Sequence, residues 1–134
     1  MVDDQEKNQE VQQEILFKLS MFEQKIRQIQ EQLQAVENGI LELNILNEGI
    51  KNIENSENSE IFAPVGRGIF VKAKLISEEL IVDVGNKNLV KKSVSETQKM
   101  IKDQILNLEE AKNELNENLL MVGKEAERIV GNVG

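Results

Sequence analysis

Apolar side chains that recur in alternating steps of four and three residues constrain this sequence more than any other feature. In the first half they occupy Ile15, Leu19, Phe22, Ile26, Ile29, Leu33, Val36, Ile40, Leu43 and Ile50, with Asn47 in step. The second half repeats the pattern at Val94, Ile101, Ile105, Leu108, Leu115, Leu119, Val122, Ala126 and Ile129, with Gln98 and Lys112 in step. This is the heptad pattern of coiled-coil helices, whose a and d side chains form a narrow stripe. The sequence therefore predicts two long helices that bury these stripes against each other.

The three polar residues of this pattern, Asn47, Gln98 and Lys112, all fall on a positions. A polar a residue fixes the register of a coiled coil at some cost in stability. For Lys112 a second interpretation stays open, because its long stem can carry the ammonium group out of the seam into solvent.

Local signals give the helix boundaries. We expect the first helix to run from near Glu6 to about Glu54, where a cluster of Asn, Ser and Glu ends it. The second helix is expected over Ser95–Ile129, because Ser95-Glu96-Thr97-Gln98 has the spacing of a capping box.

Between the two helices the apolar period changes to two. Two predicted hairpins pair Ile61–Val65 with Ile69–Leu75 around Gly66-Arg67-Gly68, and Leu80–Val84 with Leu89–Val94 around Gly85–Asn88. Hairpins of this size are unstable alone and leave strand edges unpaired. We therefore expect an α+β, mainly helical fold, in which a long antiparallel two-helix coiled coil is joined by two β-hairpins that assemble into an intersubunit β-barrel. The expected segments are 1–57 for the first helix, 58–94 for the oligomerisation module and 95–134 for the second helix.

Composition narrows the function. The net charge of −8 divides into −7 over residues 1–57, +2 over 58–93 and −3 over 94–134, so no basic face suits a nucleic acid. The chain has no Cys and no His, and its sequence has neither a signal peptide nor an apolar run that could cross a bilayer. We expect a cytoplasmic protein with no membrane partner.

No residues form a convincing catalytic or metal site. Adjacent acidic pairs such as Glu78-Glu79 and Glu109-Glu110 point in different directions on a helix and have no His or Cys beside them. Gly66-Arg67-Gly68 lacks the glycine spacing of a phosphate loop and indicates a turn. We predict that the chain is not an enzyme and uses no cofactor or metal.

The middle of the chain resembles a known family. Residues 60–74, Glu-Ile-Phe-Ala-Pro-Val-Gly-Arg-Gly-Ile-Phe-Val-Lys-Ala-Lys, are similar to the first hairpin of archaeal prefoldin α subunits, and 80–85 with 90–92 are similar to their second. Val65, Leu89 and Lys91 depart from the residues usual there. With the flanking heptads, the resemblance covers nearly the whole chain. It implies a heterohexamer with prefoldin β subunits, two α and four β, which holds unfolded client proteins without ATP and delivers them to a group II chaperonin.

Two sets of residues are predicted to carry this function. Antiparallel helices would bring the two ends of the chain together far from the hairpins, and apolar residues outside the seam gather there. These predicted client-binding residues are Leu16, Phe17, Met21, Leu120, Met121 and Val130. They have a second interpretation as ordinary extra contacts between the helices. The predicted oligomerisation residues are Ile61, Phe62, Val65, Ile69, Phe70, Val71, Leu80, Val82, Val84 and Leu89.

Two alternative functions remain at this stage. An architectural coiled-coil subunit would act as a spacer, but a spacer has no need to interrupt its heptads with a β module. A prefoldin-like member of a specialised assembly complex would have the same fold with a fixed partner.

Overall fold

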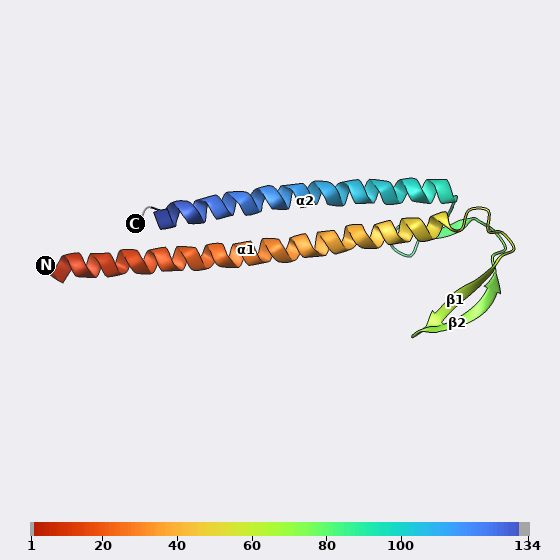
Figure 1. Ribbon diagram of the computed structural model, residues 1–134, viewed down its shortest axis with the longest axis horizontal. Coiled ribbons are helices and arrows are strands. Elements are labelled where there is room, and N and C mark those ends of the chain that lie inside the picture. Colours follow the sequence, from red (N-terminus) through yellow and green to blue (C-terminus); the bar gives the residue numbers. More distant parts are fainter. Residues whose placement is uncertain (1, 132–134) are drawn as a thin grey trace. The chain divides into compact units, whose positions relative to one another are not determined.

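The computed structural model describes residues 2–131, with side chains described from residue 4 onward. Six elements follow one another along the chain: α1 (Val2–Lys51), β1 (Glu60–Gly66), β2 (Ile69–Lys74), β3 (Leu80–Asp83), β4 (Leu89–Lys92) and α2 (Val94–Gly131) (Figure 1). They form two compact units, which divide both helices. The terminal unit holds the residues up to Gly39 and those from Leu108 onward, and the central unit is Ile40–Asn107.

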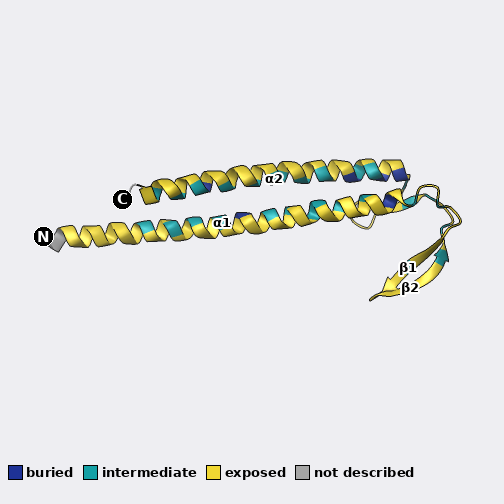
Figure 2. Ribbon diagram, in the orientation of Figure 1, coloured by how far each residue is buried: buried dark blue, intermediate teal, exposed yellow. Residues whose placement is uncertain are grey.

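The heptad stripe is the buried face of both helices. Every predicted a and d residue from Ile15 to Ile50 and from Val94 to Ile129 is buried or half-buried, whereas most residues between them are exposed (Figure 2). A two-helix seam covers only a narrow strip of each helix, which explains why few side chains are fully buried. The predicted coiled-coil seam is confirmed.

In the terminal unit the helices are antiparallel. Residues that meet across the seam advance on α1 as they recede on α2: Phe22 with Ile129, Ile29 with Val122, Glu37 with Lys112 and Gly39 with Leu108. Gly39 belongs to this packing, because a Cβ there would lie 3.3 Å from Leu108 Cδ1. A larger side chain would push the helices apart at this point.

The central unit has its own small core. Ile50 of α1 and Val94 and Ile101 of α2 are buried together, and Ile101 is only 1% exposed. Partly buried side chains surround them, namely Leu43, Ile53, Leu80 and Ile105. Because Leu80 lies on β3, this cluster also fixes the second hairpin to the helices.

The start of α2 differs from the prediction. Ser93, not Ser95, is the capping residue: its Oγ accepts a hydrogen bond from the Glu96 N–H at 3.1 Å, and the Thr97 Oγ1 hydroxyl donates to the Ser93 carbonyl at 2.8 Å. Ser93 and Glu96 have the same spacing that the prediction assigned two residues later. The earlier start follows from Val94, a buried seam residue that must already lie on the helix.

The first hairpin has the predicted strands and turn. β1 and β2 are antiparallel, with Phe62 opposite Lys72 and Pro64 opposite Phe70, and an irregularity follows between Pro64 and Gly66. Arg67 and Gly68 both have positive φ, as a type I′ turn requires. Pro64 lies in a two-stranded sheet, where both strands are edges, so the donor that it lacks interrupts no inner ladder.

The second hairpin is a separate two-stranded sheet. β3 and β4 pair Leu80 with Lys92 and Asp83 with Leu89. Asn86 and Lys87 have positive φ, and the Asn88 N–H donates to the Gly85 carbonyl at 2.9 Å, which closes the predicted turn. The fold class is confirmed: two long helices and two hairpins. Four strands in two separate sheets make no closed barrel within one chain.

Two of the polar seam residues, Lys112 and Asn47, have different surroundings. Lys112 reaches the edge of the seam, where its Nζ lies 3.7 Å from Glu37 Oε1 and its side chain is 40% exposed, which agrees with the second interpretation of this residue. Asn47 is half-buried, and its Oδ1 has no hydrogen-bond partner among the described residues. An unpaired amide oxygen in an apolar seam destabilises the folded chain.

Replacing Ile101 with Ala should lower the free energy of unfolding of the full chain by about 2–5 kcal/mol, because the change leaves a cavity in the central core. The control is Leu106 on the same helix, which is 57% exposed. Leu106→Ala should change the free energy of unfolding by less than about 0.5 kcal/mol. Urea unfolding followed by circular dichroism measures both. Equal effects of the two substitutions would contradict the assigned core.

Replacing Asn47 with Leu should raise the free energy of unfolding by about 1 kcal/mol or more, because the unpaired oxygen is removed and apolar contact is added. The same urea titration measures the gain. A loss of stability in Asn47→Leu would mean that the amide has a partner that stabilises the fold.

Candidate functional surfaces

The six predicted client-binding residues all lie in the terminal unit, and all are exposed. Three are on α1 and three on α2; together we call them the terminal patch: Leu16, Phe17, Met21, Leu120, Met121 and Val130. Phe17, the largest, is 67% exposed. Their exposure argues against the interpretation that they are extra contacts between the helices of one chain.

Two shallow grooves place the methionines on one side of the helix pair. Met21 lines the first groove with Phe22 and Ile129, and Met121 lines the second with Ile29 and Val122. Both grooves include Lys25 and Glu125, so they are neighbours along one side of the seam. Each groove is thus lined by seam residues and by one flexible methionine.

Charged residues surround the first groove. Its basic lining residues are Lys18, Lys25 and Arg128, and its acidic lining residue is Glu125. A groove lined by apolar seam residues, a methionine and charges of both signs can accept apolar peptide segments of varied shape and keep the patch soluble.

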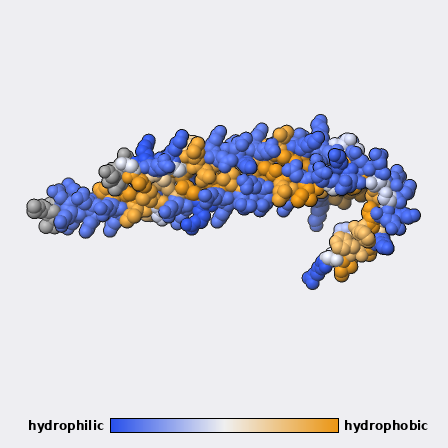
Figure 3. Space-filling view, viewed as in Figure 1, coloured by the Kyte–Doolittle hydropathy of each residue, from blue (hydrophilic) through white to orange (hydrophobic). Residues whose placement is uncertain are grey.

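The apolar surface of α1 extends further than predicted. Val11 is 52% exposed on α1, one turn before Ile15. The heptad pattern does not include Val11, because that pattern begins at Ile15. Figure 3 shows apolar surface on this part of α1, among hydrophilic neighbours.

Both faces of the first hairpin are apolar. One face carries Ile61, Ala63, Val71 and Ala73, which the register pairs across the strands. The opposite face carries Phe62, Pro64 and Phe70, flanked by Lys72. All six oligomerisation residues predicted on this hairpin are exposed, namely Ile61, Phe62, Val65, Ile69, Phe70 and Val71, and Figure 3 shows their apolar surface. A sheet that is apolar on both faces needs cover on both.

The second hairpin divides its predicted residues between two environments. Leu80 and Val82 are half-buried, and Leu80 packs against the central core of the same chain. Val84 and Leu89 are exposed. The register places Ile81, an exposed residue that the prediction omitted, on the same face as Leu89. Strict alternation from Leu80 could have identified Ile81 as the outward residue.

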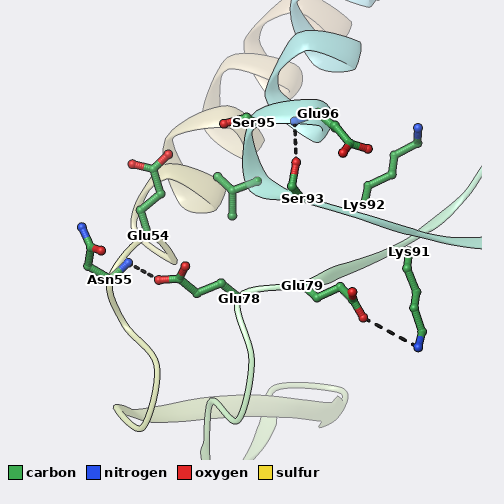
Figure 4. A pocket seen from close by; sticks show the side chains of 10 residues that line it. Glu54, Asn55, Glu78, Glu79, Lys91, Lys92, Ser93, Ser95 and Glu96 are labelled. Atoms are coloured by element: carbon green, nitrogen blue, oxygen red, sulfur yellow. Dashed lines mark hydrogen bonds and ion pairs between the residues drawn. The ribbon is translucent and has the colours of Figure 1, made fainter.

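A polar hollow in the central unit is lined by the segment after α1, the segment before β3, the end of β4 and the start of α2 (Figure 4). Several of its polar groups bind one another and so connect the segments that line it. Glu78 accepts a hydrogen bond from the Asn55 N–H, Glu79 Oε1 lies 3.8 Å from Lys91 Nζ, and Ser93 caps α2. These interactions indicate that the residues of the hollow serve to connect elements of the fold.

Between residues 2 and 131, no three His, Cys, Asp or Glu side chains are grouped so that they could hold a metal ion. Neither α1 nor α2 has, in its described part, an apolar stretch long enough to cross a membrane.

The chain is similar to known proteins over most of its length. The family model described as prefoldin subunit matches residues 22–133. Prefoldin subunit alpha of Methanobrevibacter smithii is 30% identical over 110 residues, which are 81% of this chain and 75% of that protein. Prefoldin subunit alpha of Methanococcus vannielii is 31% identical over 125 residues, 92% of this chain and 84% of that protein.

A solved structure has the same fold. A chain of the filamentous PFD from Methanocaldococcus jannaschii, determined by cryo-electron microscopy, superposes with a TM-score of 0.77 and covers 85% of this chain and 96% of its own. The two chains are 18% identical, so this likeness concerns the fold.

Proposed function

This chain belongs to the prefoldin family, and from this premise we propose that it is an α-type subunit of a co-chaperone that holds unfolded proteins without ATP. The observation that carries the proposal is the terminal patch, six exposed apolar residues that the seam does not need. Unfolded chains present apolar segments of many shapes, and exposed Phe and Met side chains adapt to such segments at little cost.

The proposed client surface is Leu16, Phe17, Met21, Leu120, Met121 and Val130. Burying one such side chain against a client stabilises the complex by about 1.5–3 kcal/mol before ordering costs are counted. Several weak contacts of this kind hold a client firmly enough to prevent aggregation, yet allow its release. Release from weak contacts needs no nucleotide hydrolysis, which agrees with our expectation that the chain is not an enzyme.

The proposed assembly surface is formed by the hairpins. Both sheets have two free edges each, and unpaired edges with apolar faces favour pairing with the same module of other chains. We infer that prefoldin β subunits supply those strands, in a heterohexamer of two α and four β chains whose strands close an intersubunit β-barrel. Residues 58–94 would then be the oligomerisation module, between helical segments 1–57 and 95–134. The double hairpin also disfavours an architectural spacer.

The wider setting is proposed from the family alone. The complex would work in the cytoplasm and deliver its clients to a group II chaperonin.

Replacing Phe17 and Met21 together with Ser should weaken suppression of client aggregation about tenfold, because the loss of two apolar contacts removes more than about 1.4 kcal/mol of binding free energy. The assay is light scattering of a chemically denatured client diluted into the assembled complex. Leu106→Ser is the matched control, since Leu106 is equally exposed but lies in the central unit. Undiminished suppression by the Phe17/Met21 variant in an intact complex would reject the client surface.

A tagged copy of this chain, purified from its native lysate, should emerge in a complex whose intact mass corresponds to six small subunits. Native mass spectrometry of the purified complex measures this mass. An isolated monomer or a simple dimer in the lysate would contradict the proposed heterohexamer.

A further inference from the structure

One apolar face of α1 in the central unit has no role in the fold described above. Leu41, Ile45 and Leu46 are exposed, Ile45 to 63%, and none belongs to the heptad seam. Ile45 lies two residues from both Leu43 and Asn47, so on a helix it points away from α2. Three neighbouring aliphatic side chains on one outer face form a patch that water disfavours.

Gly49 extends this face by one turn beyond Ile45. A Cβ added at Gly49 would meet no atom within 4 Å, so nothing in the described chain requires a glycine there. Gly39 is different, because Leu108 approaches it closely. Glycine destabilises a helix interior relative to alanine. At Gly49 the missing side chain leaves the helix backbone open to close approach by a surface outside the chain.

The first hairpin, which every copy of this chain carries, offers a surface that fits this face. Phe62 and Phe70 lie on one face of the first hairpin, 70% and 56% exposed, so this face is not docked on its own helix. Lys72 and Lys74 share that face with one acidic residue, Glu60 opposite Lys74, so its net charge is positive. On α1 the apolar patch is interspersed with Glu42 and Glu48, both exposed. Among the described residues, none of these charged side chains takes part in an ion pair.

We propose that the α1 face formed by Leu41, Ile45, Leu46 and Gly49 is the docking site for the Phe62/Phe70 face of the first hairpin of a second copy of this chain. The inference rests on the proposed function, because it takes the other hairpin face, with Ile61 and Val71, to be turned into the shared barrel. A sheet in such a barrel has one inner and one outer face. The outer face carries the phenylalanines and needs cover.

The contact is reciprocal and therefore closes. If the hairpin of each copy covers the helix of the other, the two identical contacts are related by a twofold axis. The exposed parts of the four phenylalanines can bury roughly 400–600 Å² in total, since each ring is already partly covered in its own chain. With the aliphatic side chains they meet, the buried area approaches the range of about 1,200–2,000 Å² that stable interfaces need.

Cysteine cross-linking tests the pairing directly, because the natural chain has no cysteine. Full-length Ile45→Cys and differently tagged Phe70→Cys chains are mixed within the assembled complex and oxidised. The proposal predicts a covalent dimer of the two tagged chains. The control pair, Ile76→Cys with Phe70→Cys, uses a position outside the patch that is more exposed than Ile45, at 84%, and should give no such product. No product from the first pair, or equal product from both, overturns the proposal.

Gly49→Ala separates docking from folding. In the full chain alone this variant should raise the thermal midpoint of helix unfolding, because Ala favours a helix, yet weaken copy-to-copy association about tenfold, because the methyl group blocks close approach. Gly123→Ala is the matched control: its Cβ also meets nothing within 4 Å, but it lies in the terminal unit. It should raise the midpoint and leave association unchanged. Sedimentation equilibrium and circular dichroism give the two readouts.

Failure of the docking proposal can be distinguished from failure of the proposed function. If Gly49→Ala leaves association unchanged, or if Ile45→Ser weakens client holding without affecting association, the α1 face is not a docking site for the hairpin. Either result leaves the terminal patch and the heterohexamer intact, since those depend on client suppression by the Phe17/Met21 variant and on the mass of the complex.

Discussion

The two-helix seam is the interaction on which the rest of the structure depends. Its apolar side chains are mostly half-buried, since one helix can cover only a strip of another. Few of the described residues are buried, Ile101 and Val122 among them, so the chain gains its stability from many modest contacts. An extended seam of this kind leaves most of the surface free, which suits a protein that works by presenting surfaces to other chains.

The seam also determines what the exposed apolar residues can do. Because it covers mainly the a and d positions, most apolar residues elsewhere on the described parts of the helices stay exposed. The Phe and Met residues of the terminal patch suit clients of varied sequence, whereas the aliphatic face around Ile45 and the aromatic face around Phe70 suit fixed partners. The difference in side-chain type gives the two units different proposed roles.

Sequence reasoning predicted the seam and both hairpins because each follows from a strict period and from turn residues such as Arg67-Gly68. It misplaced the α2 cap by two residues, since two overlapping serine motifs compete there and only the burial of Val94 decides between them. It also missed Ile81 and the face around Ile45. Those residues lie outside the expected stripes, and their exposure depends on which face each element turns toward its neighbours, which only the three-dimensional structure gives.

The central claim is that unfolded clients bind at the terminal patch. Its most direct test is a photo-crosslinking amino acid placed at Phe17 in the assembled complex, with the same substitution at Leu106 as reference, followed by exposure to a denatured client and mass analysis of the adducts. The account predicts abundant adducts from position 17 and few from position 106. Equal yields at the two positions, or adducts from position 106 alone, would contradict it.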